Sequence, residues 1–269
     1  MDKKGALRIA IASFAFGTIV WIGRVHPIPS ADMISLCGAM LGDALLYAAM
    51  VWLLYLALEP AARSRWPHAI VTWNRILAGR WKDAQVGSHI LIGAALGTAI
   101  WVLLAIPTSG PKNTLQGGID LWPLLGTRQW VASGIGTLNA ALIAGLLAFF
   151  AIFGLRALLK KDWLAAIAAS VLFTFSEGQV VTDPNWMKLA AIYVASYAVL
   201  MFVLLRVGLV TTISMIFFIN AIGRICLGAD FKAWWAPHGF ASMALLLGIA
   251  AYAFWRSIGT RPSSINDRQ

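Results

Sequence analysis

The chain has 269 residues, of which 60% are hydrophobic and only 12% are charged, and its mean hydropathy is +0.77. Because soluble domains carry roughly 25% charged residues, this composition excludes an ordinary water-soluble domain. The formal net charge of +10 would suit a nucleic-acid-binding protein, so the positions of the charges have to decide that question.

Apolar runs long enough to cross a membrane recur from one end of the chain to the other. A transmembrane helix needs about 20 such residues to cross a hydrocarbon layer roughly 30 Å thick. Hydropathy, punctuated by Gly, Pro and charged residues, predicts eight spans, at 7–24, 33–58, 89–106, 131–155, 163–181, 187–205, 207–224 and 238–257. The fifth has a short apolar part that ends before Glu177, so a tilted or re-entrant segment is the alternative there.

These spans predict an all-α fold, a single polytopic transmembrane bundle of about eight helices that covers residues 1–269. A basic loop at 59–88 lies within it, and a polar tail follows at 258–269. With the N-terminus placed inside, most of the 21 basic residues fall in inner loops, and this orientation accounts for the whole net charge. Nucleic-acid binding thereby loses its support, and both termini are predicted to be cytoplasmic.

The basic loop at 59–88 has helical periodicity. Trp66, Trp73 and Trp81 share one face of a helical wheel, and Arg65 and Arg75 lie on the other face. This pattern predicts an interfacial amphipathic helix at the headgroups of an anionic inner leaflet, as a topology anchor or, alternatively, as a docking surface. The residues predicted to contact the membrane surface or a partner are Arg63, Arg65, Trp66, Trp73, Arg75, Arg80, Trp81 and Lys82.

The same loop contains a distinctive set of residues, namely Glu59, Pro60, Arg63, Arg65, Trp66, Pro67, Trp73, Arg75, Leu77, Ala78, Gly79, Arg80, Asp83, Val86 and Gly87. In these positions it resembles the membrane region that follows the catalytic domain in a group of bacterial, notably acidobacterial, serine/threonine protein kinases. Shorter likenesses lie at 5–10, 123–128, 204–209 and 230–236, and the chain departs from the pattern at Ala84, Gln85, Ser88 and His89. The resemblance implies a membrane module of a sensory kinase in the bacterial inner membrane, with a cytoplasmic kinase domain as its partner.

Motifs for catalysis are missing from the sequence. The kinase strings V-A-I-K, H-R-D and D-F-G do not occur. The four histidines are dispersed without H-x-x-H or H-E-x-x-H spacing. We therefore expect a protein that is not an enzyme and that has no catalytic residue, metal site or cofactor.

Polar groups inside the spans are the best candidates for a functional site, because a charged side chain in hydrocarbon is costly unless it is paired. Asp43 is the strongest, and its candidate partners are Asn139, Glu177, Asn220 and Arg224. A structural salt bridge or hydrogen bond that fixes helix packing is the alternative. Two Gly-x-x-x-Gly pairs, at Gly38 and Gly42 and at Gly93 and Gly97, predict close helix contacts within the chain, while a homo-oligomer stays open.

Two functions follow from these features. The first is a non-catalytic membrane module that anchors, and senses a signal for, a serine/threonine-kinase-type signalling system. The second is a small transporter or channel that binds a cation or polar solute near the middle of the membrane.

Overall fold

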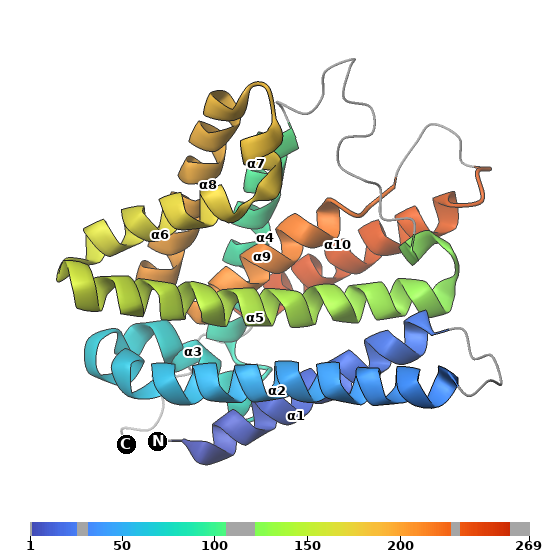
Figure 1. Cartoon of the computed structure of the whole chain (residues 1–269), viewed down its shortest axis with the longest axis horizontal. Helices are drawn as coiled ribbons and strands as arrows, with labels where there is room; N and C mark the ends of the chain where they lie inside the picture. Colours follow the sequence, from blue (N-terminus) through green and yellow to red (C-terminus); the bar gives the residue numbers. More distant parts are fainter. Residues whose placement is uncertain (1, 26–31, 106–121, 227–231, 259–269) are drawn as a thin grey trace, which may run out of the picture.

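The computed structural model describes residues 2–25, 32–105, 122–226 and 232–258. These residues form helices and no strand, which confirms the predicted all-α fold (Figure 1). The elements are α1 (Lys3–Arg24), α2 (Asp32–Arg65), α3 (Pro67–Leu77), α4 (Ala84–Ala105), the 3-10 turn η2 (Trp122–Leu124), α5 (Thr127–Leu159), α6 (Asp162–Ser176), α7 (Gly178–Thr182), α8 (Trp186–Arg206), α9 (Leu209–Ile222) and α10 (Ala236–Ile258). The predicted polar tail lies outside the described residues from 259 onwards.

Six of these helices, α1, α2, α4, α5, α8 and α10, are long and apolar enough to cross a membrane. The fifth and seventh predicted spans correspond to shorter apolar helices, the 15-residue α6 and the 14-residue α9. At 1.5 Å per residue each is a little over 20 Å long, which is less than the roughly 30 Å hydrocarbon layer. The chain is therefore a multi-pass membrane protein. Its two short apolar helices, α6 and α9, are too short to cross the hydrocarbon layer by themselves.

The most buried of these helices is α9, which packs against α4 and α5. Gly93 and Gly97 of α4 make the contact with α9 close. A Cβ atom on Gly93 would lie 2.5 Å from the Thr211 carbonyl oxygen, and one on Gly97 would lie 2.6 Å from the Met215 carbonyl oxygen. The prediction that this glycine pair serves a contact within the chain is confirmed.

The other glycine pair, on α2, behaves differently. A Cβ atom on Gly38 or Gly42 would meet no described atom within 4 Å. Further along α2, Ala44 does face α1, because a Cβ atom added to Gly17 of α1 would lie 3.5 Å from the Ala44 Cβ atom. The prediction of a close contact within the chain is therefore wrong for Gly38 and Gly42, because α1 packs on a different face of α2.

Hydrogen bonds bring the basic segments together at one end of the bundle, which we call the basic end. The Arg8 guanidinium of α1 donates to the Leu77 carbonyl oxygen of α3 at 2.7 Å. The Arg256 side chain at the end of α10 donates to the Lys82 carbonyl oxygen. The beginnings of α1 and α4 and the ends of α3 and α10 thus meet there, as expected of loops predicted to share one side of the membrane.

The predicted amphipathic helix exists as α3, which ends at Leu77 and is followed by a left-handed Gly79 with φ of +78°. Its tryptophan face, however, packs into the protein. Trp66 and Trp73 are 6% and 7% exposed, and the Trp66 ring lies 5.9 Å from that of Phe149. The predicted membrane-surface role is therefore wrong for these two rings, because an apolar helix face packs equally well on a helix bundle as on lipid. Trp81 lies beyond the helix and is 61% exposed.

Candidate functional site

The five polar residues predicted inside the membrane do not form one cluster. Asp43 lies exposed on α2, and no interaction joins it to the other four within the part of the chain that the structure describes. Asn139 of α5 accepts a hydrogen bond of 2.9 Å from the Ser13 hydroxyl of α1. Arg224, just after α9, donates to the Thr137 hydroxyl of α5 at 3.1 Å. Asn139 and Arg224 therefore join helices, in line with the structural alternative.

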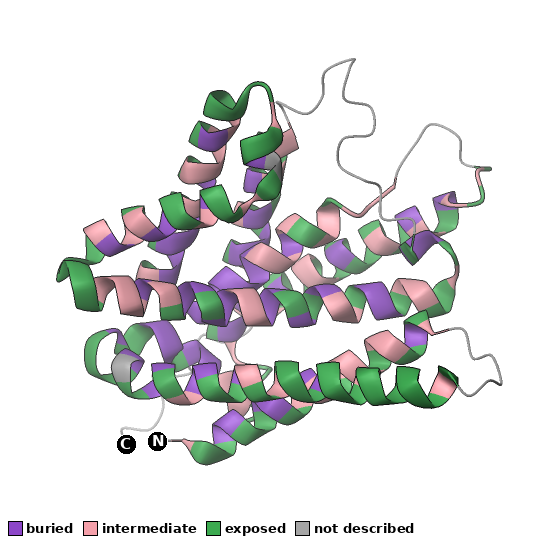
Figure 2. Ribbon diagram, viewed as in Figure 1, coloured by how far each residue is buried: buried purple, intermediate pink, exposed green. Residues whose placement is uncertain are grey.

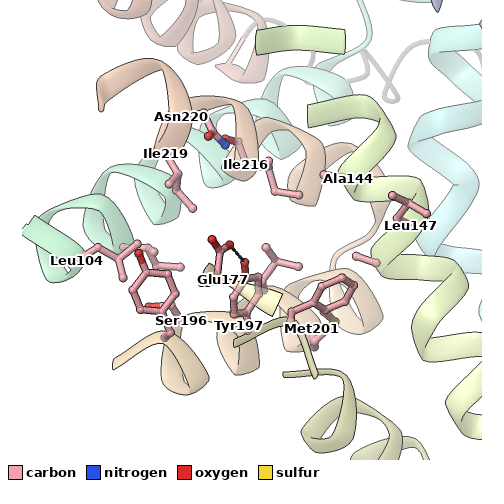
Figure 3. Close-up of a pocket in the computed structure, with 15 residues that line it drawn as sticks. Leu104, Ala144, Leu147, Glu177, Ser196, Tyr197, Met201, Ile216, Ile219 and Asn220 are labelled. Carbon is pink, nitrogen blue, oxygen red and sulfur yellow. Dashed lines mark hydrogen bonds between the residues drawn. The ribbon is translucent and has the colours of Figure 1, made fainter. Parts of the chain in front are cut away.

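Glu177 and Asn220 are brought together, because both line one cavity of about 400 Å³. Five helices or their ends form its walls, namely α4, α5, α6, α8 and α9. Figure 3 shows Glu177 and Tyr197 pointing toward each other, with Asn220 on a different wall. Most of the lining is apolar, with Leu104 and Met201 among the labelled residues. We call this cavity the Glu177 pocket.

A break in the chain places Glu177 in this pocket. The helix α6 ends at Ser176, and Glu177 adopts an extended backbone conformation with φ of −77° and ψ of 104° before the short α7 begins at Gly178. Glycine is a poor helix former, so the step from Glu177 to Gly178 favours an interruption. The break explains why the fifth predicted span is not one continuous helix.

The pocket lies deep in the apolar part of the bundle. Tyr197, which contacts Glu177, is close to the middle of the 21-residue α8. A helix of this length is about 31 Å long and matches the hydrocarbon layer. The Glu177 carboxyl group therefore lies about halfway along α8. An ionised group at such a level of a membrane-spanning helix is costly and is a reason to look for function.

One strong hydrogen bond holds the carboxylate. The Tyr197 hydroxyl donates to Glu177 Oε1 at 2.5 Å, within the range of a charge-assisted O–H···O bond. A carboxylate can accept several hydrogen bonds. Among the described residues, Tyr197 is the donor of the single hydrogen bond that the Glu177 side chain accepts. The second carboxylate oxygen therefore has acceptor capacity for a ligand.

Aromatic rings flank this carboxylate. The rings of Phe173 and Tyr197 stack with a centroid distance of 5.6 Å, and those of Tyr193 and Tyr197 lie 6.5 Å apart. All three residues line the Glu177 pocket. Because aromatic faces attract cations, especially where water is excluded, the rings and the carboxylate favour the same kind of ligand, one with a positive charge on an apolar body.

Sequence reasoning identified Glu177 and Asn220 but missed Phe173, Tyr193 and Tyr197. A signal for the tyrosines was present, because positions 193 and 197 are four residues apart and share one face of a helix. No sequence pattern links that face to Glu177, which comes from another helix. For metals, the described residues contain no group of three or more His, Cys, Asp or Glu side chains that would hold an ion.

Comparisons of the sequence and the structure with known proteins gave no matching family, no matching curated protein and no matching solved structure.

Proposed function

We propose that this protein binds a small organic cation with an apolar body in the Glu177 pocket and carries it across the membrane. The observation behind the proposal is the Glu177–Tyr197 hydrogen bond at a break between two helices, inside a cavity of about 400 Å³. Interrupted helices near the middle of the membrane are the places where transporters bind their substrates. The volume lies within the range of small-molecule sites.

The chemistry of the lining supports a cation over an anion. Glu177 is the acidic group among the described residues that line the pocket, and these include no Lys, Arg or His side chain. An anion would meet an uncompensated negative charge there, whereas a cation would neutralise the carboxylate and lower the cost of keeping it in hydrocarbon. The apolar remainder of the wall suits the alkyl or aryl groups of an amine or quaternary ammonium ion.

Binding of tetraphenylphosphonium to the purified full chain in nanodiscs tests the proposal. We expect Glu177→Gln to weaken binding at least tenfold, because it removes the negative charge but keeps the shape of the side chain. Tyr197→Phe is expected to weaken binding less, since the ring stays. Asp43→Asn is the matched control, because it also removes a carboxylate from a predicted span but lies outside the pocket.

Equal affinity of the wild-type protein and Glu177→Gln would contradict the proposed site. Transport is tested separately, by uptake of labelled tetraethylammonium into proteoliposomes. Uptake that depends on Glu177 supports a carrier. Binding without uptake would contradict the carrier and leave a ligand-sensing membrane module.

A signalling module in the bacterial inner membrane, with both termini in the cytoplasm, is the second candidate. It is favoured by exposed cations at the basic end, where Arg65, Arg80 and Lys82 are all exposed. Arg63 is also exposed but pairs with Glu59 at 2.9 Å, and Arg75 pairs with Asp83 at 2.8 Å, so both have structural roles. The resemblance to the membrane region of serine/threonine kinases supports the same candidate.

Cross-linking in native membranes followed by mass spectrometry tests this candidate. We expect a serine/threonine kinase to be captured through the exposed cations and to be lost from a triple variant, Arg65→Gln, Arg80→Gln and Lys82→Gln. Arg75 stays unchanged in that variant because its loss would disturb Asp83. Absence of a kinase from the cross-links of the well-inserted wild-type protein would count against the signalling role.

A further inference from the structure

A second and larger hollow lies at the basic end. It is a groove of about 700 Å³, lined by residues of α1, α3, α4, α5, α9 and α10 and by the connection between α3 and α4. It shares no lining residue with the Glu177 pocket. We call it the Arg8 groove.

The walls of the Arg8 groove come from α1 and α10, and α3 adds Trp73, Ile76 and Leu77. On one side, α1 contributes Ile9, Ala12 and Phe16, and it packs on α2 and α5. On the other side, α10 contributes Ile249 and packs mainly on α4. The base is formed by α5 and α9, with Leu142 and Ile213 among its residues, so almost the whole lining is apolar.

The mouth of the groove, unlike its apolar walls, carries a charged side chain. Arg8 is the charged residue among the lining side chains, and it lies beside Gly79 and the 61% exposed Trp81. The Arg8 guanidinium uses one donor on the Leu77 carbonyl oxygen, and a guanidinium has five. Donors therefore remain for an anion at the mouth of the groove.

Further cations lie next to Trp81, which lines this mouth. Arg80 and Lys82 flank Trp81 in the chain and are exposed, and Arg256 reaches the Lys82 carbonyl oxygen from α10. The neighbouring acidic group, Asp83, is neutralised by Arg75, which donates to both of its carboxylate oxygens at 2.9 and 2.8 Å. The mouth of the groove is therefore locally positive.

We propose that the Arg8 groove is a binding site for an anionic phospholipid of the leaflet at the basic end. The headgroup phosphate lies against Arg8, with Arg80 and Lys82 beside it, and one acyl chain lies along the apolar groove between α1 and α10. Charge complementarity selects the headgroup, because guanidinium–phosphate hydrogen bonds are charge-assisted. Trp81 occupies the headgroup level, where tryptophan is enriched.

An acyl chain is the occupant that this geometry favours. The groove is apolar along its length, so a soluble anion would meet few partners beyond Arg8. A zwitterionic lipid would fill the apolar part equally well but has no net charge to offer the cations at the mouth. The proposal thus requires selectivity by headgroup, which separates it from general solvation of the helices by lipid.

Native mass spectrometry of the delipidated full chain tests the proposal. The chain is mixed with equimolar phosphatidylglycerol and phosphatidylethanolamine that carry identical acyl chains. We expect phosphatidylglycerol to be retained at least threefold more than phosphatidylethanolamine. Arg8→Gln is expected to abolish this preference, and Arg8→Lys to keep most of it. Arg24→Gln is the matched control, because Arg24 lies at the other end of the same helix.

Ala12→Phe tests the acyl chain independently of charge. Ala12 lines the groove, so a phenyl ring there is expected to lower the retention of both lipids at least twofold. Unchanged thermal unfolding of each variant confirms that the fold is kept. Equal retention of the two lipids by the wild-type protein would overturn the proposal, as would an Arg8→Gln protein that matches Arg24→Gln. A protein dimer without bound lipid would also overturn it.

Discussion

The two Gly-x-x-x-Gly pairs of this chain have opposite surroundings. The pair on α4 lies against the α9 backbone, whereas the pair on α2 has no described atom within 4 Å of an added Cβ. Figure 2 shows the contrast, since the half of α2 that begins at Asp32 is mostly exposed. The motif therefore indicates only that a helix can be approached closely. The topology decides whether another helix of the chain lies there.

Substituting one glycine in each pair should give the largest difference. In Gly97→Leu the new side chain would begin 2.6 Å from the Met215 carbonyl oxygen, so α4 and α9 would have to separate. We expect a loss of about 3 kcal/mol of unfolding free energy. Gly42→Leu, on the open face, should stay within about 0.5 kcal/mol. Reversible unfolding in detergent micelles measures both, and equal losses would contradict the contrast.

Side-chain truncation should sharpen the same contrast with a smaller effect. Met215 of α9 is 0% exposed, and Met215→Ala leaves a cavity that should cost about 2 kcal/mol. Leu46 of α2 is 64% exposed, and Leu46→Ala should change stability by less than about 0.5 kcal/mol. The unfolding midpoints of the two variants in the same detergent provide the measurement. A larger loss for Leu46→Ala would show that α2 is covered in the assembled protein.

A polar contact tests the packing of α1 against α5. Ser13 is fully buried and donates to Asn139 Oδ1 at 2.9 Å. Hydrogen bonds between transmembrane helices contribute about 0.6 kcal/mol on average and up to about 1.7 kcal/mol. We expect a double-mutant cycle with Ser13→Ala and Asn139→Ala to give a coupling energy of about 1 kcal/mol. Additive effects of the two substitutions would exclude the hydrogen bond as a stabilising contact.

The smallest effect concerns Asp83, an acidic residue with an ionic partner, whereas Asp43 has none among the described residues. Partial burial opposes ionisation, but hydrogen bonds from the Gln85 backbone N–H and from Arg75 outweigh it, so the pKa of Asp83 is lowered. A lowered pKa in the folded state means that the pair stabilises the fold above about pH 4, the pKa range of an unfolded aspartate. This stabilisation is lost as the pH falls through the lowered pKa.

We therefore expect Asp83→Asn to be less stable than the wild-type protein by about 0.5 kcal/mol at pH 7, because the pair is partly exposed. The difference should shrink below about pH 4. Unfolding at a series of pH values measures it, with Arg75→Gln as the matched variant that removes the same pair from the other side. A difference that persists undiminished at low pH would contradict the assignment.

The helices themselves were predictable because lipid demands long apolar runs, and each predicted span corresponds to an apolar helix. Whether a given helix face packs against protein or against lipid was not predictable. Trp66 and Trp73 have the spacing of an interfacial face, yet they pack inside the bundle. Apolar periodicity does not distinguish lipid from protein as the neighbour, so the sequence left this choice open.

The candidate site was predictable only in part, for a related reason. Glu177 is conspicuous in an apolar span, so its residue type was enough to select it. Asp43 is equally conspicuous but lies on an exposed face, away from the pocket. Tyr197 reaches Glu177 from another helix, and this contact depends on how α6 and α8 pack, which composition and spacing do not specify.

The close fit of α9 between α4 and α5 has a consequence for how the protein is made. Only Val207 and Gly208 connect α8 to α9, and Gly208 has φ of +128° with no room for a Cβ beside the Ala69 carbonyl oxygen. Such a tight connection favours insertion of α8 and α9 into the bilayer as one hairpin. Until residues 209–222 leave the ribosome, the glycine face of α4 has no partner. The packing of α4 can therefore be completed only after α9 has been synthesised.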